Sequence, residues 1–261
     1  MPEHYELSEM TSPEFREAAK TIKLALIPVG ATEQHGPNLA LATDYAVAHR
    51  LSQRLAQRLH PRAVVVPPIP FGFSHHHMSF AGTISVSPET FTAMCMDVAR
   101  SLKRNGVRHL LFVNGHNGNS AVLNVITNKI YYELEVATAV SFYFTQAGDR
   151  VKAHSRTGRN GHACEIEASV VLYLAPQLVR TESLAAGELI PTERRYAFNN
   201  QPFALQMPMA FDKQTRNGAF GDARLADAEI GRDIVETAIA RTLEFIEGFI
   251  SDGAYRPERS S

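Results

Sequence analysis

Acidic and imidazole side chains follow two apolar segments of the sequence, at the points where those segments end. Glu33 and His35 follow the first segment, Asp44 lies one loop later, and His116 follows another. Imidazole nitrogens and carboxylate oxygens are ligands that zinc, manganese and iron accept. Two such ions a few ångström apart need a carboxylate between them to screen their repulsion, and Asp44 is the candidate bridge. Because paired ions make a shared water nucleophilic and polarise a carbonyl group, these residues predict metal-dependent hydrolysis.

Further donor side chains lie elsewhere in the chain. Glu165 stands near the start of a predicted helix and adds a third carboxylate. Three consecutive histidines, His75, His76 and His77, invite a metal or substrate role. In an extended segment neighbouring side chains point to opposite sides, so at most two of the three can face one site. We expect His77 to face it.

Each of these residues also has an ordinary structural interpretation. Asp44 before an amphipathic helix can be an N-cap, and Glu33 and His35 can be solvated in a loop. Asn-Gly pairs are usually turns, and a structural role for all three consecutive histidines is an equal alternative. The metal interpretation is favoured because the carboxyl ends of parallel strands meet at one edge of a sheet, where ligands bind.

The elements that must position these residues alternate between strand and helix. Apolar runs, typical of strands buried on both faces, occupy residues 23–30, 63–66 and 110–113. Residues 136–144 are predicted as a fourth strand by their Val, Thr, Phe and Tyr content. Apolar residues at helical spacing predict helices over about 43–59, 87–105, 122–130, 162–174 and 223–250. This alternation predicts an α/β fold with a parallel sheet and right-handed crossovers. No linker divides the chain, so residues 1–261 are expected to form one domain; residues 176–221 lack a periodicity that would place them.

Composition and missing motifs exclude several other classes of protein. The 261 residues carry 26 Lys and Arg against 27 Asp and Glu, which leaves no basic field for nucleic acid or anionic lipid. No apolar run approaches the roughly 20 residues that span a bilayer, and the N-terminus lacks a signal-peptide pattern, so a cytoplasmic protein is expected. The two cysteines have no paired spacing, and any metal must use nitrogen and oxygen ligands. Dinucleotide, P-loop, zincin and serine-hydrolase motifs are absent from the sequence.

Several short motifs together resemble the creatininase family of metal-dependent amidohydrolases. They are residues 27–36 (IPVGATEQHG), Asp44, residues 80–83 (FAGT), residues 114–116 (NGH) and residues 161–167 (GHACEIE). The resemblance spans about residues 22–175. It implies a three-layer α/β/α sandwich with a mostly parallel sheet, assembled as a homohexamer. It also implies two divalent metal ions per subunit, of zinc, manganese or iron.

The resemblance further implies how the ligands divide between the two ions. Glu33 and His116 hold one ion, His35 holds the other, and Asp44 bridges them. In creatininase itself the remaining carboxylate lies two residues after the histidine of Asn-Gly-His. This chain has Gly118 at that position, which has no ligand to offer.

The missing carboxylate is expected from the His-Ala-x-Glu motif, as in relatives with the Asn-Gly-His-x-Gly-Asn pattern. Here that residue is Glu165, with Glu167 as the alternative last ligand. His162 matches a family histidine that passes a proton to the departing nitrogen, and imidazole titrates near neutrality, as a general acid should. On a helix His162 and Glu165 share a face, and the two are taken together as catalytic. The alternative for His162 is a helix-start histidine held by backbone carbonyls.

Substrate contacts are expected from the loops around this site. The predicted residues are His77, Asn117, Gly118 and Asn119, and Gly118 lets the backbone approach closely because it has no side chain. The family's Pro in the FAGT element is Ala81 here, which alters the wall of the pocket.

These features predict a hydrolase that attacks the carbonyl carbon of a small, polar, cyclic amide or formamide with metal-bound hydroxide. Creatinine is a poor match, because creatininase closes over it with tryptophans and this chain has none. Cleavage of a C–C bond in a cyclic ketone such as an oxidised inositol, and metal-dependent peptide trimming, stay open, because the fold does not choose among them. The non-enzymatic alternative is an assembly module braced by metal.

Overall fold

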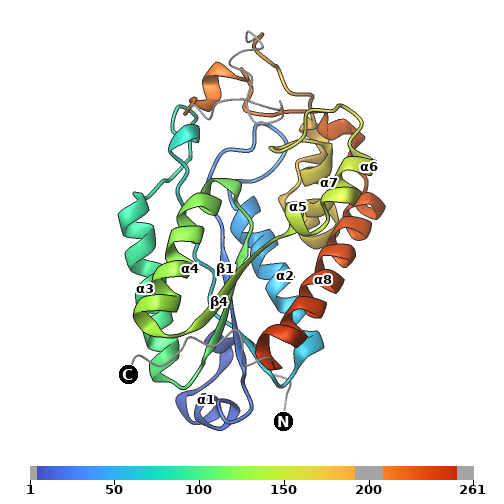
Figure 1. Ribbon diagram of the computed structural model, residues 1–261. Coiled ribbons are helices and arrows are strands. Elements are labelled where there is room, and N and C mark those ends of the chain that lie inside the picture. Colours follow the sequence, from blue (N-terminus) through green and yellow to red (C-terminus); the bar gives the residue numbers. More distant parts are fainter. Residues whose placement is uncertain (1–4, 192–207, 252–261) are drawn as a thin grey trace.

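One parallel sheet runs through the centre of the computed structural model, which describes residues 5–191 and 208–251 (Figure 1). Its strands are β1 (Leu24–Val29), β2 (Ala63–Val65), β3 (His109–Asn114) and β4 (Ala137–Phe142), in the order β2-β1-β3-β4. Leu24 pairs with Ala63 on one side and with His109 on the other, and every pairing is parallel. The strands and the parallel sheet predicted from the sequence are confirmed.

Helices cover both faces of this sheet. On one face lie α3 (Pro88–Arg104) and α4 (Ser120–Leu134); on the other lie α2 (Thr43–Leu59), α7 (Glu165–Leu174) and α8 (Ala228–Ser251) (Figure 1). Because strand side chains alternate, Ala25 and Ile27 pack toward α3 and α4, whereas Leu24 and Leu26 pack toward α2 and α8. The predicted three-layer sandwich is therefore confirmed.

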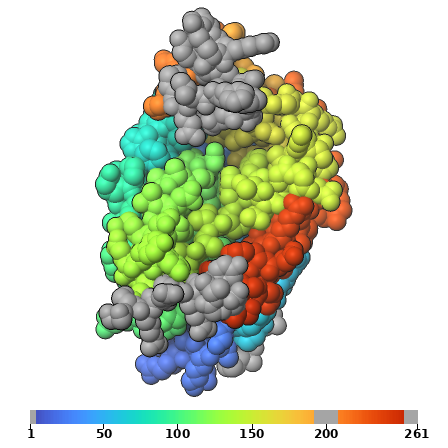
Figure 2. Space-filling model, in the orientation of Figure 1, coloured from blue at the N-terminus to red at the C-terminus, as the bar shows by residue number. Residues whose placement is uncertain are grey.

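Shorter elements fill the connections. They are α1 (Ser12–Ala18), α5 (Tyr143–Gln146), α6 (Gly148–His154) and 3-10 turns at Leu7–Glu9, His75–His77, Asn117–Asn119, Pro176–Leu178, Thr181–Ser183, Phe211–Lys213 and Ala223–Leu225. On the face shown in Figure 2, α4, the segment with α5 and α6, and α8 form the surface. The sequence left residues 176–221 without a predicted structure, and residues 192–207 of that stretch lie outside the described residues. The expectation of a single domain over residues 1–261 stays a prediction. Along the described chain no helix combines the length and apolar character that crossing a bilayer requires.

Several boundaries differ from the sequence prediction by a few residues, and two of them bear on the site. The fourth strand ends at Phe142, where α5 begins, rather than at residue 144. The helix predicted from residue 162 begins at Glu165. Ala163 has a φ of +50°, in the left-handed region that a helix does not contain, so His162 lies in a turn before α7.

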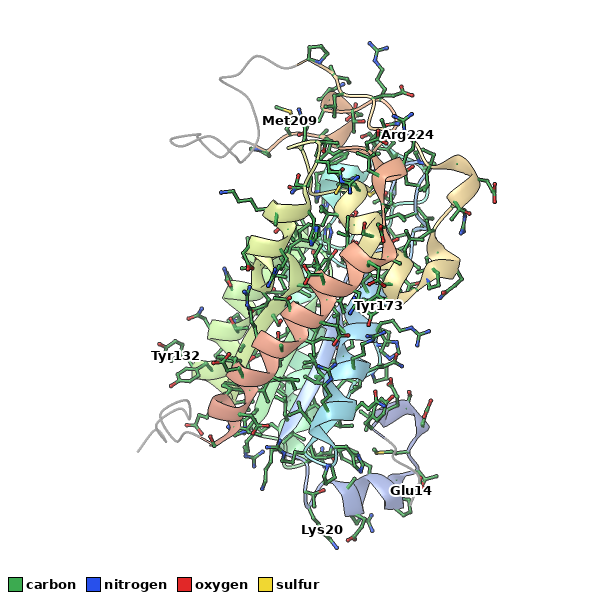
Figure 3. The ribbon with its side chains drawn as sticks, turned by 90° about the vertical axis from the view of Figure 1, so that its right-hand side faces the viewer. Glu14, Lys20, Tyr132, Tyr173, Met209 and Arg224 are labelled. Carbon is green, nitrogen blue, oxygen red and sulfur yellow. The ribbon has the colours of Figure 1, made fainter. Side chains whose placement is uncertain are left out.

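The start of α8 is docked directly on α7. A Cβ atom on Gly231 would lie 1.9 Å from the carbonyl oxygen of Ser169 in α7. The Ser169 hydroxyl also accepts a hydrogen bond from the main-chain N–H of Asp227 at 2.9 Å. Figure 3 shows Tyr173 of α7 beside α8, where its hydroxyl donates to Glu236 at 3.1 Å. These contacts with α8 hold α7 in place, and the first turn of α7 carries the carboxylates of Glu165 and Glu167.

We expect Gly231→Ala to destabilise the protein by about 1–3 kcal/mol, because the added methyl group must force α8 away from α7. Gly248→Ala is the matched control in the same helix, since its Cβ would meet no atom within 4 Å. This control should be neutral or stabilise by about 0.5–1 kcal/mol. Urea unfolding of both variants measures the difference, and equal stabilities would contradict the close packing.

Candidate metal centre

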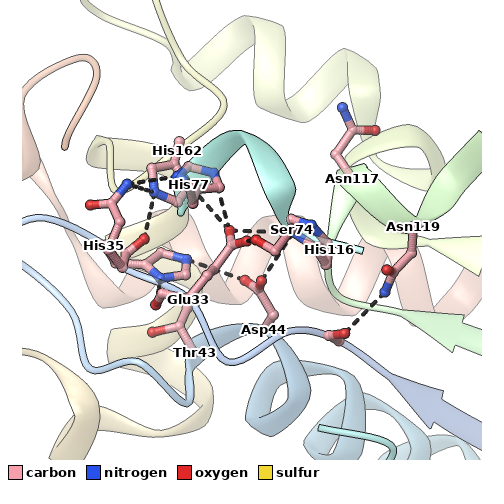
Figure 4. Close-up of polar contacts among 12 residues, drawn as sticks. Glu33, His35, Thr43, Asp44, Ser74, His77, His116, Asn117, Asn119 and His162 are labelled. Atoms are coloured by element: carbon pink, nitrogen blue, oxygen red, sulfur yellow. Dashed lines mark hydrogen bonds and ion pairs between the residues drawn. The ribbon is translucent and has the colours of Figure 1, made fainter. Parts of the chain in front are cut away.

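Four of the predicted ligands meet at the carboxyl ends of β1 and β3 (Figure 4). Glu33 and His35 lie in the loop after β1, Asp44 is the second residue of α2, and His116 follows β3 by two residues. All four are buried, with exposed fractions of 4% or less. The four residues that the sequence grouped by their positions after strand ends therefore lie together in the structure.

Asp44 lies between the two imidazoles of this cluster. His35 Nε2 is 3.2 Å from Asp44 Oδ1, and His116 Nδ1 is 3.1 Å from Asp44 Oδ2. His116 Nδ1 is also 3.3 Å from Glu33 Oε1. One carboxylate oxygen thus faces each histidine, which is the arrangement that a carboxylate bridging two ions requires.

Two polar atoms of the cluster are buried without a hydrogen bond to any described residue. They are His35 Nε2 and Asp44 Oδ2, whose close neighbours are not aligned for hydrogen bonding. Proteins rarely leave buried polar atoms unpaired. Imidazole and carboxylate lone pairs that converge in this way are the donors that divalent cations bind, so the donor set fits a metal centre.

Two glycines set the depth at which α2 begins. A Cβ on Gly30, after β1, would lie 2.3 Å from the main-chain nitrogen of Tyr45, and a Cβ on Gly115, after β3, would lie 2.1 Å from the carbonyl oxygen of Asp44. The main chain at Asp44 therefore touches both strand ends. The N-cap of α2 is Ala42, so the alternative interpretation of Asp44 as the N-cap does not apply.

Glu167 is the carboxylate that α7 contributes to the cluster. Its Oε2 lies 3.7 Å from His35 Nε2 and accepts a hydrogen bond from the main-chain N–H of Ala163 at 2.5 Å. Nitrogen and oxygen atoms of His35, His162 and Glu167 lie within 4.8 Å of one another, close enough to share an ion. Glu167, which the sequence left open as the alternative last ligand, therefore lies beside His35 in the cluster.

Glu165 does not join the cluster, and its predicted metal and catalytic roles are corrected. Its Oε1 accepts hydrogen bonds from the main-chain N–H and hydroxyl of Thr157, at 3.1 and 2.7 Å. Its Oε2 accepts from the main-chain N–H of Asp222 at 3.0 Å. Since His162 precedes the helix, the two residues do not share a helical face. Glu165 instead holds two loops beside the site.

His162 lies in the cluster, as predicted. Its Nδ1 is 3.7 Å from Glu33 Oε1, its ring centroid is 4.4 Å from that of His35, and its Nε2 is 2.8 Å from the carbonyl oxygen of Gln34. The turn that carries it is held by Asn38, whose side-chain amide donates to the carbonyl of Ala163 at 2.9 Å. This turn aims the imidazole at Glu33.

The three consecutive histidines form a 3-10 turn rather than an extended segment. Neighbouring side chains in such a turn diverge by about 120°, so two adjacent ones can reach the same site. His77 Nε2 lies 3.5 Å from Glu33 Oε1, as expected of the residue that faces the site. His76, expected to lie outside it, stacks on His116 with ring centroids 5.6 Å apart. His75 is exposed.

The residues after His116 do not line a substrate pocket in the way that the sequence predicted. Asn119 is fully buried; its Oδ1 accepts from the main-chain N–H of Phe73 at 2.9 Å, and its amide donates to the carbonyl that follows β1 at 3.0 Å. Asn119 is thus a structural anchor, which corrects its predicted substrate contact. Asn117 is exposed and points away from the cluster (Figure 4). Gly118 does allow a close approach, but the group that approaches it is His116. A Cβ atom added to Gly118 would lie 2.3 Å from His116 Nε2.

Other residues of the site gave no signal in the sequence. Ser74 donates a hydrogen bond from its hydroxyl to Glu33 Oε2. The Phe211 ring covers both imidazoles, with centroids 4.1 Å from His77 and 4.8 Å from His162. A single serine or phenylalanine in a loop has no spacing that marks it. Only its neighbours in space show its position.

Burial and neighbouring charges move the pKa values of the ligands in different directions. Burial raises the pKa of Glu33, and the nearby Asp44 carboxylate adds to this while His116 opposes it. Burial alone would lower the pKa of His116, but the Glu33 and Asp44 carboxylates raise it to about 10. Burial alone would also lower the pKa of His35, but the Glu167 and Asp44 carboxylates raise it well above its usual value. A divalent cation would replace the protons that these imidazoles hold.

The pKa values of His77 and His162 shift in the opposite direction from those of His35 and His116. Burial lowers the pKa of His162, and the nearby His35 adds to this. Burial also lowers the pKa of His77, with a further contribution from His162. Both imidazoles are therefore neutral, with one nitrogen that donates and one that accepts.

Comparisons with known proteins show the family to which the chain belongs. The family model described as creatininase, creatinine amidohydrolase, matches residues 8–246. The chain is 31% identical to a mycofactocin precursor peptide peptidase of Mycobacterium ulcerans over 93% of each chain. It is 27% identical to a 3-dehydro-scyllo-inosose hydrolase of Thermotoga maritima over 93% of this chain and 81% of that one. A creatinine amidohydrolase of Pseudomonas putida is 35% identical, but over only 36% of this chain and 38% of that one.

Solved structures show the same fold. A crystal structure of a putative creatinine amidohydrolase from Bacteroides fragilis matches with a TM-score of 0.84 and 24% identity over 98% of this chain and all of that one. A mutant creatininase of the Zn-Zn type matches with a TM-score of 0.78 and 25% identity over 94% of this chain and 98% of that one. The chain belongs to the creatininase family of metal-dependent hydrolases. The alternative of a non-enzymatic assembly module is therefore set aside.

We predict that Glu167→Gln and Glu165→Gln separate a ligand from a structural anchor. Glu167→Gln should lower the zinc or manganese content per chain and reduce metal affinity about 10-fold or more, because a carboxylate beside His35 is lost. Glu165→Gln should keep its metal and lose thermal stability instead, because its hydrogen bonds to the two loops weaken. Metal analysis after dialysis and thermal unfolding measure both effects. Loss of metal in Glu165→Gln alone would contradict the placement of these residues.

Proposed function

We propose that this chain hydrolyses an amide C–N bond at a pair of divalent cations. The ligands would be Glu33 and His116 for one ion, His35 and Glu167 for the other, and Asp44 between them. The observation that supports this most directly is the buried, unpaired His35 Nε2 and Asp44 Oδ2. A second observation is that Glu33, His35 and Asp44 bring donor atoms within 4.8 Å of one another.

The bound ions would make a water molecule nucleophilic and polarise the substrate carbonyl. The protein's own side chains would manage the protons. His162 Nδ1 faces Glu33 Oε1 at 3.7 Å, at the edge of the cluster, so it can take the water proton and pass it to the departing nitrogen. The hydroxyl of Ser74 holds the other carboxylate oxygen of Glu33, which fixes the orientation of that ligand. Phe211 shields the imidazoles from water.

For the substrate we propose a peptide amide in first place. The relative named as a peptidase is similar over 93% of both chains, whereas the creatinine amidohydrolase of Pseudomonas putida is similar over little more than a third. Exposed apolar side chains flank the histidines in the same segment, at Phe71, Met78 and Ile84, with exposed fractions of 39%, 52% and 49%. An extended chain can lie on such a surface. The small cyclic amide or formamide and the cyclic ketone stay as alternatives.

A substrate panel tests the proposed reaction. The chain would be loaded with zinc or manganese and offered short apolar peptides, creatinine and other cyclic amides, N-formyl amines and cyclic ketones. We expect release of an amine from a peptide, abolished by chelation and restored by metal. Turnover of the cyclic ketone alone would reject the amide proposal, and turnover of none of them by metal-loaded protein would reject a hydrolase of these classes.

We expect His162→Gln to retain its metal and its fold but to lower kcat about 100-fold or more, because removing a general acid or base costs about that factor. His60→Gln is the matched control, since His60 is also an exposed histidine and lies at the C-terminal end of α2, the end away from Asp44. Its kcat should equal that of the unchanged chain. Unaltered turnover in His162→Gln would show that the proton travels by another route.

The assembly and the location of the protein stay predictions. The homohexamer implied by the family resemblance is testable by light scattering of the full chain, and six-fold mass would support it. We also propose a cytoplasmic location, which fractionation of cells that express the chain would test.

A further inference from the structure

The orientation of the Gln34 side-chain amide is fixed by two main-chain groups. Its Oε1 accepts a hydrogen bond from the N–H of Gly36 at 2.9 Å, and its Nε2 donates to the carbonyl oxygen of Gly218 at 3.1 Å. A main-chain N–H can only donate and a carbonyl oxygen can only accept. The nitrogen of this amide therefore points toward Gly218 and the two imidazoles, and the flipped orientation is excluded.

This amide determines which nitrogen of His77 carries the proton. Gln34 Nε2 lies 2.8 Å from His77 Nδ1. An amide nitrogen is only a donor, so Nδ1 must be the bare, accepting nitrogen of the ring. The hydrogen of His77 is then on Nε2, which is the atom that faces Glu33 Oε1 at 3.5 Å.

The main chain of the same residue determines the tautomer of His162. The carbonyl oxygen of Gln34 lies 2.8 Å from His162 Nε2 and can only accept, so this nitrogen carries the hydrogen. The neutral ring then has its lone pair on Nδ1, which faces Glu33 at 3.7 Å. Both hydrogens of the Gln34 amide are used by His77 and Gly218, and its 3.0 Å contact with His162 Nε2 brings two donors together without a hydrogen bond.

The opposite assignment leaves more groups unsatisfied. If His162 Nε2 were bare, it would accept from the Gln34 amide, and the carbonyl oxygen of Gln34 would face a lone pair at 2.8 Å. The amide has two hydrogens for three acceptors in that case, so either His77 Nδ1 or the Gly218 carbonyl would lose its donor. An unpaired buried acceptor destabilises the fold because it gives up its hydrogen bonds to water without a replacement. The first assignment is therefore favoured.

We propose that Gln34 is a positioning residue that holds His77 and His162 in the same Nε2–H tautomer. His77 then faces Glu33 through Nε2, and His162 faces it through Nδ1. Both rings lie beside Glu33 (Figure 4). In the inferred tautomers His77 presents an N–H donor to this carboxylate, and His162 presents a bare Nδ1. The inference deepens the proposed function and rests on it for its catalytic meaning. His162 begins a turnover as the base.

The proton then follows a balanced path. A water O–H bond breaks as its proton goes to His162 Nδ1 and its oxygen forms a bond to the substrate carbonyl carbon, while the hydrogen bond from His162 Nε2 to the Gln34 carbonyl oxygen stays intact. The charged ring next gives the Nδ1 proton to the departing nitrogen, which takes the electron pair of the broken C–N bond. His77 keeps its proton throughout and serves as a fixed donor to the carboxylate or to a substrate oxygen.

Nitrogen-15 NMR of the zinc-loaded, histidine-labelled chain tests the tautomers directly, because bare and protonated ring nitrogens have well separated shifts. Signals would be assigned with His77→Gln and His162→Gln. We expect a bare Nδ1 and a protonated Nε2 in both rings. A protonated Nδ1 in either neutral ring of the unchanged chain would overturn the inference, whatever its activity.

Gln34→Glu supplies the test of cause, because a carboxylate accepts where the amide donates. In this variant His77 Nδ1 should gain a proton, whereas His162 should keep its Nε2–H, which a main-chain carbonyl holds. A bare His77 Nδ1 in the variant would contradict the role of the side chain. The control is Gln57→Glu, the same change at an exposed residue of α2, which should alter neither ring.

Turnover rates, measured beside the tautomers, distinguish a failure of the positioning role from a failure of the proposed function. With the peptide substrate, Gln34→Glu should lower kcat about 10-fold or more at unchanged metal content, and Gln57→Glu should leave kcat unchanged. If the unchanged chain shows the expected tautomers but hydrolyses nothing in the panel, the proposed function fails and the positioning role stands. If it is active with the opposite tautomers, only the inference fails.

Discussion

Three carboxylates share one buried cluster, and the fold must make that arrangement stable. Glu33, Asp44 and Glu167 are exposed by 1%, 2% and 4%. Burying one carboxylate costs several kcal/mol even after relaxation, and neighbouring like charges repel. Two imidazoles, His35 and His116, lie within hydrogen-bonding distance of this charge and offset part of the cost. Divalent cations carry twice the charge of an imidazolium, so they would offset more.

The rest of the architecture serves to hold these groups in place. Two strands of a parallel sheet, each buried along its length, end at the same edge and deliver Glu33, His35 and His116 there. The main chain of α2 touches both strand ends, which is how Asp44 reaches a central position. The packing of α8 on α7 secures Glu167. An apolar core on each face of the sheet fixes all of these elements relative to one another.

The sequence was sufficient to predict the fold and to group four candidate ligands, because both follow from simple regularities. Continuous apolar runs identify buried strands, and the ends of parallel strands converge, so Glu33, His35, Asp44 and His116 could be grouped without a structure. The side chains that were misplaced depend on local geometry. Glu165 and Glu167 exchange roles because the helix begins three residues later than its apolar pattern suggests, which is within the usual uncertainty of a helix boundary. His76 was missed because a 3-10 turn replaces an extended segment, and no pattern distinguishes a buried anchoring asparagine from one that contacts substrate.

Relatives named for different substrates match most of this chain, so we expect specificity to come from the walls around the cluster. The proposed chemistry therefore depends on a pair of divalent cations. Anomalous diffraction from crystals grown with zinc, measured on both sides of its absorption edge, would locate these ions. We expect two peaks per chain, both within about 2.0–2.2 Å of the Asp44 carboxylate, with His35 on one ion and His116 on the other. A single peak, no peak, or an ion held at Glu165 would contradict the account.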